Sequence, residues 1–130
     1  MSTMRLEPFL RVDETAFSAS SGDITSLKGE PLWSGRNDVG LNELDYGDVV
    51  YRFQDCGRLE EITKEASVVV LGKVAVPSHI LAFFIREHDG AAFERAGFLV
   101  SPEFGLAFDP TDPCWVTAIA KHCVNTWKEL

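Results

Sequence analysis

The sequence predicts an α+β fold in which a mainly antiparallel β-sheet (a meander) packs against two main α-helices. Short apolar stretches separated by glycine-containing turns occupy the middle of the chain, and apolar residues recur at helical spacing after Ser78 and after Pro113. The composition, 45% hydrophobic and 25% charged, is that of an ordinary globular protein. With 130 residues and no repeat or linker, residues 1–130 are expected to form a single domain.

An edge strand and a short helix are expected near the N-terminus. Residues 4–12 have strand character interrupted by Pro8, and an edge position suits proline because it cannot donate a hydrogen bond to a neighbouring strand. Residues 23–28 are predicted to form a short helix, with Ser21 as its N-cap and Gly29 at its end.

The middle of the chain is expected to form the antiparallel meander. Its four strands span residues 39–46, 48–54, 58–64 and 67–71. Gly47 and Gly57 supply the flexible backbone that the first two turns need. Val49, Tyr51 and Phe53 alternate along the second strand and share one face. The fourth strand is apolar on both faces and is expected to be the most deeply buried.

The first main helix is expected to begin near Ser78. Four apolar residues recur at helical spacing after it: Ile80, Leu81, Phe84 and Ile85. The pair Asp89-Gly90 ends this pattern. Residues 91–96 are predicted to add further helical turns.

A hairpin and the second main helix are expected to complete the chain. Residues 98–100 and 105–108 are predicted to pair with each other. Asp112 is a suitable N-cap, and Pro113 suits the first helical position because proline lacks the N–H that a helix leaves unpaired there. The apolar stripe of this helix comprises Val116, Ile119, Ala120, Cys123, Val124 and Trp127.

The sequence contains no motif for catalysis or for binding a cofactor or metal. Cys114 and Cys123 are nine residues apart, which matches no zinc-binding spacing, and Cys123 is expected to be a small core residue. The adjacent His122 is expected to point about 100° around the helix from Cys123. His79, His88 and His122 stand in no catalytic pattern, and His88 suits the end of a helix. The chain is therefore expected not to be an enzyme and to need no cofactor or metal.

The charge of the chain favours a basic protein as its partner. Twenty acidic against twelve basic residues give a formal net charge of −8, which repels nucleic acid and anionic membrane surfaces and attracts basic proteins. No apolar run is long enough to cross a membrane and no signal-peptide-like stretch is present, so a cytoplasmic location is expected. The three cysteines are expected to be free thiols. The oligomeric state is left open.

The predicted meander carries a concentration of acidic side chains. Residues 38–65 contain eight acidic and three basic side chains, although strands are normally poor in Asp and Glu. An acidic face is therefore expected to bind the partner, and its residues are Glu43, Asp45, Tyr46, Asp48, Glu60 and Glu61. The alternative is a solvated sheet face without a binding role.

Residues 44–53 and 57–62, within a compact acidic chain, resemble the small bacterial immunity proteins that are encoded beside contact-dependent or other polymorphic toxins. The resemblance implies that the chain binds a cognate toxin, commonly a basic nuclease, and docks an acidic face over its active site. Residues 21–31 and the strands after them also resemble the helix-then-sheet modules of the β-lactamase-inhibitor-protein fold. A small enzyme that uses a histidine and a protein-binding adaptor are the alternative functions.

Overall fold

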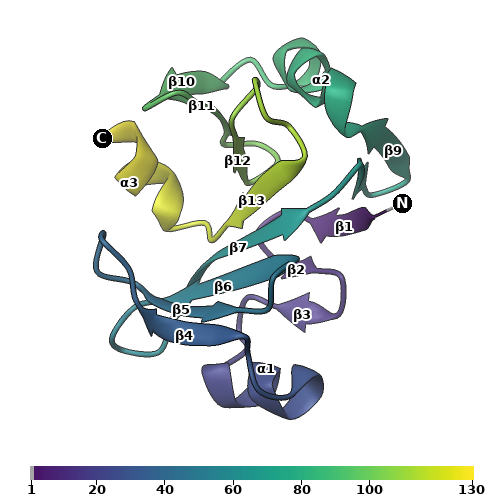
Figure 1. The fold of residues 1–130 in the computed structure, drawn as a ribbon. Helices are drawn as coiled ribbons and strands as arrows, with labels where there is room; N and C mark the ends of the chain where they lie inside the picture. The colour runs from purple at the N-terminus through teal and green to yellow at the C-terminus, as the bar shows by residue number, and fades with distance from the viewer. Residues whose placement is uncertain (1) are drawn as a thin grey trace.

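The computed structural model describes residues 2–130 and confirms the α+β class, with two β-sheets and three α-helices (Figure 1). The strands of the smaller sheet are β1 (Thr3–Glu7), β2 (Arg11–Val12), β3 (Thr15–Ala16), β8 (Val68–Leu71) and β9 (Val74–Pro77). Those of the larger sheet are β4 (Trp33–Arg36), β5 (Asn42–Asp45), β6 (Val49–Phe53), β7 (Leu59–Glu65), β10 (Phe93–Arg95), β11 (Phe98–Ser101), β12 (Leu106–Phe108) and β13 (Trp115–Ile119). The helices are α1 (Ser21–Lys28), the 3-10 turn η1 (Ser78–Ile80), α2 (Leu81–His88) and α3 (Cys123–Lys128). None of the helices in residues 2–130 has the length and apolar character that crossing a membrane requires.

Two units with the same order of elements make up the larger sheet, whose strand order is β10-β11-β12-β13-β7-β6-β5-β4. Helix α1 is followed by the antiparallel strands β4 to β7, and α2 is followed by the antiparallel strands β10 to β13. The last strands of the two units, β7 and β13, pair with each other at the centre of the sheet. The helix-then-sheet order expected after Ser21 is therefore present twice, although the sequence shows no repeat.

One apolar cluster joins both sheets to α1 and α2. It contains Met4 of β1, Tyr51 of β6 and Ile62 of β7, together with Ile24 of α1 and Leu81 of α2. Both helices and the smaller sheet therefore cover the same face of the larger sheet. On the opposite face α3 packs on a second cluster, which comprises Val100, Ala107, Ile119, Ala120 and Cys123.

The final helix is much shorter than predicted. Residues 115–119 form β13, and α3 begins only at Cys123. β13 lies between β12 and β7, and residues 116–120 are all buried. A strand that is buried on both faces lacks apolar–polar alternation, so its apolar run matched helical spacing. The predicted caps, Asp112 and Pro113, lie in the loop before β13.

The fourth strand of the predicted meander belongs to the smaller sheet instead. β8 pairs in parallel with β1, where Val69 is opposite Met4. Val68 and Val70 on its other face are only partly buried, so the expectation of burial on both faces is wrong. β1 in turn lies between β2 and β8 and is not an edge strand. It ends at Glu7, so Pro8 falls outside the hydrogen-bonded ladder.

Residues 91–96 do not extend the first main helix, because Phe93–Arg95 form β10. Ala96 and Gly97, with φ of 52° and 83°, make the two-residue turn that joins β10 to β11. A pair of left-handed residues matches the twist of a hairpin, which a helix cannot accommodate. The hairpin of β11 and β12 and the helical segment after Ser78 are as predicted.

Helix α1 confirms the predicted short helix, with Ser20 in place of Ser21 as its N-cap. The Asp23 N–H donates to Ser20 Oγ at 3.1 Å, and the Ser20 N–H donates to Asp23 Oδ2 at 2.9 Å. This reciprocal capping box satisfies two backbone donors that the helix start leaves free. Gly29 ends the helix with a φ of 83°, which glycine adopts without strain.

Candidate functional site

Three of the six predicted binding residues lie on one face of the larger sheet. In the antiparallel register, Glu43 of β5 is opposite Arg52 of β6, and Arg52 is opposite Glu61 of β7. Asp45 follows Glu43 by two residues and points to the same side. This side is opposite α1 and α2, and we call it the open face. Its side chains are Trp33, Glu43, Asp45, Arg52, Glu61, Thr63, Trp115 and Thr117.

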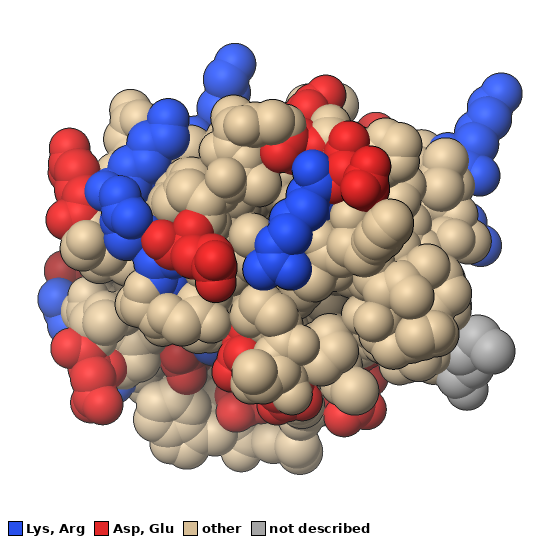
Figure 2. All heavy atoms as spheres, turned by 90° about the horizontal axis from the view of Figure 1, so that it is seen from above, with Lys and Arg blue, Asp and Glu red and all other residues tan. Residues whose placement is uncertain are grey.

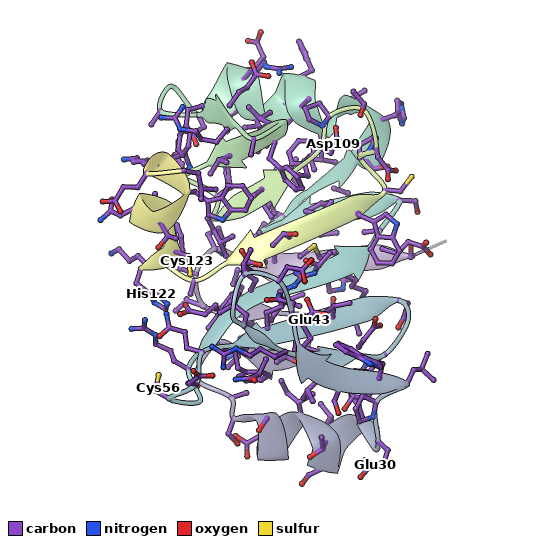
Figure 3. The ribbon with its side chains drawn as sticks, turned by 60° about the vertical axis from the view of Figure 1, so that its left-hand side comes forward. Glu30, Glu43, Cys56, Asp109, His122 and Cys123 are labelled. Carbon is purple, nitrogen blue, oxygen red and sulfur yellow. The ribbon has the colours of Figure 1, made fainter. Side chains whose placement is uncertain are left out.

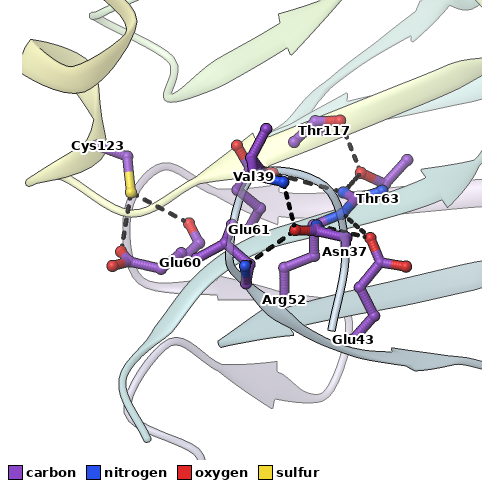
Figure 4. Close-up of polar contacts among 10 residues, drawn as sticks. Asn37, Val39, Glu43, Arg52, Glu60, Glu61, Thr63, Thr117 and Cys123 are labelled. Carbon is purple, nitrogen blue, oxygen red and sulfur yellow. Dashed lines mark hydrogen bonds and ion pairs between the residues drawn. The ribbon is translucent and has the colours of Figure 1, made fainter. Parts of the chain in front are cut away.

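Arg52 holds the centre of the open face (Figure 4). Its Nε donates to Glu43 Oε2 at 2.8 Å, while its Nη1 donates to the Thr63 hydroxyl at 2.6 Å and lies 3.5 Å from Glu61 Oε1. Thr63 in turn shares a 2.7 Å hydrogen bond with Thr117 of β13. The network therefore crosses from one four-stranded unit to the other, and two of the predicted binding acids are paired with a base.

The two acids beside Arg52 have opposite protonation tendencies. Burial alone would raise the pKa of Glu43, but the hydrogen bonds from Asn37 and Arg52, with the Arg52 charge, outweigh burial and lower that pKa. Burial is also the largest influence on Glu61, and it raises the Glu61 pKa because Arg52 offsets it only in part. Glu43 is therefore the ionised partner of Arg52. Ionising Glu61 costs more free energy, because burial disfavours its charged form.

Tyr46 and Asp48 lie away from the open face. The Tyr46 hydroxyl donates to the Gly29 carbonyl at 2.8 Å, and its ring meets the Tyr51 ring edge-on with centroids 5.9 Å apart. Tyr46 therefore ties the end of α1 to the larger sheet. Asp48 is exposed in the turn between β5 and β6 and lines a separate cleft beside Lys28. The six predicted residues thus do not form one acidic face.

A cleft of about 370 Å³ opens on the open face where the two units meet. Three aromatic side chains line it, Phe98, Trp115 and Trp127, together with three acids, Glu61, Asp109 and Asp112. The remaining walls are Arg52, Thr63 and Thr117. Arg52 is the one basic side chain of this lining, and it is already paired with acids. The cleft is therefore both aromatic and acidic, which suits a cationic side chain.

The aromatic and acidic walls of the cleft were not apparent from the sequence. The helix predicted from Pro113 puts Trp115 and Trp127 on one element, whereas the structure divides them between β13 and α3. Asp109 accepts hydrogen bonds from the hydroxyl and the N–H of Thr111, at 2.7 and 2.8 Å, and these bonds lower its pKa. The sequence feature that could have indicated the acidic wall is the pair Asp109 and Asp112, which directly follows the strand predicted at residues 105–108.

Exposed apolar side chains extend the open face towards β4. The Trp33 ring lies over Gly35, where an added Cβ would come within 2.6 Å of the ring. Gly35 therefore allows the half-exposed Trp33 to lie across the sheet. In the loop between β4 and β5, Asn37 accepts a hydrogen bond from the Val39 N–H and donates to Glu43. This loop presents Val39, which is 77% exposed, and Figure 4 shows its bond to Asn37.

Charge is mixed on the part of the surface that Figure 2 shows. Acidic and basic side chains alternate across the molecule as it is seen from above, the side where α2 lies in Figure 1. The net charge of −8 therefore does not make this side uniformly acidic.

A second polar cluster lies at the start of β7, next to α3. Glu60 is only 3% exposed, and its Oε2 contacts His122 Nε2 and accepts a hydrogen bond from the Cys123 thiol at 2.9 Å. Arg58 approaches the other carboxylate oxygen at 3.4 Å. His122 and Cys123 lie together, to one side of Glu43 (Figure 3). The sequence did not reveal this cluster because Glu60 is 62 positions from His122.

Without a cation, this cluster does not activate Cys123 as a nucleophile. Burial is the largest influence, and with the hydrogen bond to Glu60 it raises the pKa of the thiol, whereas a reactive cysteine has a lowered pKa. Cys56 and Cys114 are exposed and Cys123 is buried, and all three are free thiols as predicted. The prediction of Cys123 as a core residue is also confirmed.

The other two histidines lie elsewhere. His88, at the end of α2 as predicted, contacts the Phe84 ring in a tilted arrangement with ring centroids 4.4 Å apart. His79 is exposed in η1. No histidine is among the residues that line the cleft of the open face.

No protein-family model, no curated protein and no solved structure matches this chain. Its function is therefore inferred from the open face of the larger sheet and from the cluster around Glu60.

Proposed function

We propose that this chain is an immunity-type inhibitor that binds a basic bacterial toxin domain of the nuclease class and covers the active site of that domain. The open face of the larger sheet is the docking surface, and the cleft where the two units meet is its anchor point. Among the acids expected from the sequence, Glu43, Asp45 and Glu61 belong to this surface. Tyr46, Asp48 and Glu60 have other contacts and do not.

The aromatic and acidic cleft carries this proposal. Its aromatic walls, Trp115, Trp127 and Phe98, lie with the acidic walls Glu61, Asp109 and Asp112 around one volume. An Arg or Lys side chain from a partner gains both cation–π and ion-pair contacts in such a cleft. Buried aromatic side chains are also the usual energetic centre of a protein interface. A nucleic-acid ligand does not fit, because these acids repel phosphates.

The charge of the whole chain supports the same kind of partner. A net charge of −8 attracts a basic protein and raises its association rate at low salt. A nuclease must present a basic active site, because its substrate is a chain of phosphates. An inhibitor that places acids in that site therefore binds the toxin and blocks its substrate with the same contacts.

Binding to the toxin domain encoded by a neighbouring gene tests this function. Trp115→Ala is expected to weaken binding by more than about tenfold, or about 1.4 kcal/mol, as expected for an aromatic anchor. Replacing Asp109 and Asp112 together by Asn is expected to slow association and to reduce its dependence on salt. Titration calorimetry gives the affinity, and stopped-flow mixing at two ionic strengths gives the association rate.

The matched control removes two acids from the other side of the molecule. Glu7→Gln on β1 with Glu87→Gln on α2 changes the net charge equally, but both elements pack behind the larger sheet. The control is expected to retain the affinity of the unmodified chain. An inhibitor role is contradicted if the neighbouring gene product is not bound. Docking through the cleft is contradicted if folded cleft variants bind as tightly as the control.

A further inference from the structure

The cluster around Glu60 has a second implication, independent of toxin binding. We propose that Glu60, His122 and Cys123 form a binding site for a divalent transition metal, with zinc as the best fit and a fourth coordination position open to solvent. This differs from the expectation that the chain binds no metal, because the sequence did not place Glu60 beside the other two residues.

The positions of the three ligand atoms match a metal site. The imidazole nitrogen of His122, a carboxylate oxygen of Glu60 and the sulfur of Cys123 all lie within 4.8 Å of one another. In a tetrahedral zinc site with bonds of about 2.0–2.3 Å, neighbouring ligand atoms are about 3.3–3.6 Å apart. Side-chain shifts of under about 1 Å therefore bring all three atoms to bonding distance of one ion.

The types of donor atom select the metal. Thiolate and imidazole ligands favour zinc and other late transition metals, whereas magnesium and calcium take oxygen ligands. One thiolate and one carboxylate neutralise a dication, so the occupied site buries no net charge. The His122 side chain is 35% exposed, which leaves room on that side for a water molecule as the fourth ligand.

Neighbouring contacts hold the ligands in place. Arg58 lies 3.4 Å from Glu60 Oε1 and leaves Oε2 facing His122 and Cys123. The Ala120 N–H donates to the Glu60 carbonyl at 2.9 Å, and the Cys123 N–H donates to the Ala120 carbonyl at 2.9 Å. These backbone bonds fix the turn before α3 against β7. Outer contacts of this kind orient ligands and raise metal affinity.

Metal binding at this cluster releases one proton. The metal–sulfur bond forms as the thiol of Cys123 loses its proton to solvent, and His122 binds through the lone pair of Nε2 as the neutral tautomer whose proton is on Nδ1. Glu60 binds as the carboxylate, and the oxidation state of the metal does not change.

Titration of the metal-free chain with cobalt(II) tests the site, because cobalt occupies zinc sites and its bond to a thiolate produces a charge-transfer absorption in the near ultraviolet. The absorption is expected to saturate at one ion per chain and to disappear when zinc is added. The double variant Cys56→Ser and Cys114→Ser removes two exposed thiols outside the cluster and is expected to keep the absorption. Cys123→Ser is expected to lose it. His122→Ala is expected to weaken cobalt binding by more than about tenfold.

Two results would overturn the metal site. One is the absence of the charge-transfer absorption from the unmodified chain at saturating cobalt, and the other is its persistence in folded Cys123→Ser. If circular dichroism shows that Cys123→Ser does not fold, the cobalt affinity of His122→Ala is the deciding measurement. This variant is expected to fold because the His122 side chain is partly exposed. An unchanged cobalt affinity in His122→Ala excludes the metal site. None of the three ligands lines the cleft of the open face, so failure here leaves the inhibitor role standing.

Discussion

The two four-stranded units of the larger sheet have the same order of elements but bury different kinds of side chain. In the first unit, β5 is only partly buried throughout, and its Glu43 pairs with Arg52. In the second unit, β12 is completely buried, and β13 is buried from Val116 onwards. Helix α3 accounts for the difference, because Val124 and Trp127 pack on the outer face of the second unit.

This difference shows how one topology can serve two purposes. The second unit is covered by α2 on one face and by α3 over part of the other, and it depends mainly on apolar burial for its stability. The first unit keeps its outer face accessible and stabilises that face with ion pairs and hydrogen bonds. The polar outer face of the first unit is accessible to a partner, and it continues into the cleft that Trp115 and Trp127 line beside the second unit. Three substitutions test the division, from the largest expected effect to the smallest.

The largest effect is expected in the apolar second unit. Phe108 of β12 is fully buried in the main core, and Phe108→Ala is expected to lower the free energy of unfolding by about 3–5 kcal/mol. Urea denaturation measures the loss. Val39→Ala, at an exposed position in the first unit, is the control and is expected to change stability by less than about 0.5 kcal/mol. A loss below about 1 kcal/mol for Phe108→Ala would show that Phe108 is not a central residue of the core.

An intermediate effect is expected from the ion pairs of the first unit. Arg52→Met leaves Glu43 and Glu61 without their cation in a partly buried site, and it is expected to cost about 2–3 kcal/mol. The control is Arg36→Met, because the pair of Arg36 with Asp55 is exposed and is expected to contribute less than about 1 kcal/mol. Equal losses in urea denaturation would show that the Arg52 network is only a surface network.

The smallest effect is expected where the two units meet. Because burial raises the Glu61 pKa, ionised Glu61 disfavours the fold above that pKa, and the cost disappears as pH falls towards the ordinary value of 4.5. Glu61→Gln is therefore expected to stabilise the chain by about 0.5–1 kcal/mol at neutral pH and to give no gain below the ordinary pKa. Urea denaturation across this pH range measures the difference from the unmodified chain.

Glu43→Gln is the matched control, with the opposite sign. The pKa of Glu43 is lowered, so its carboxylate stabilises the fold above the ordinary value of 4.5 and loses this contribution as pH falls through the lowered pKa. The substitution is therefore expected to destabilise the chain at neutral pH and to have little effect in strong acid. If Glu43→Gln instead raised the free energy of unfolding at neutral pH, Glu43 would not be the ionised partner of Arg52.

Local patterns predicted the parts of the fold that depend on neighbouring residues. Val49, Tyr51 and Phe53 share one face of β6 as predicted, and all three are buried because that face meets the core. The N-cap of α1 was predicted to within one residue, because capping depends on side chains next to the helix end. The turn at Gly57, where φ is 93°, was predicted for the same reason.

The sequence by itself determined the α+β class, the acidic excess and the strands that flank Arg52, because alternation, turn residues and charge are properties of short segments. Only the tertiary structure decided that residues 115–119 form the central strand β13, since burial on both faces erased the alternation that marks a strand. The tertiary structure also forms the open-face cleft and brings Glu60 into contact with His122, 62 positions away. Such contacts form only after the chain has closed a long loop, and no local pattern records which distant segment will pair.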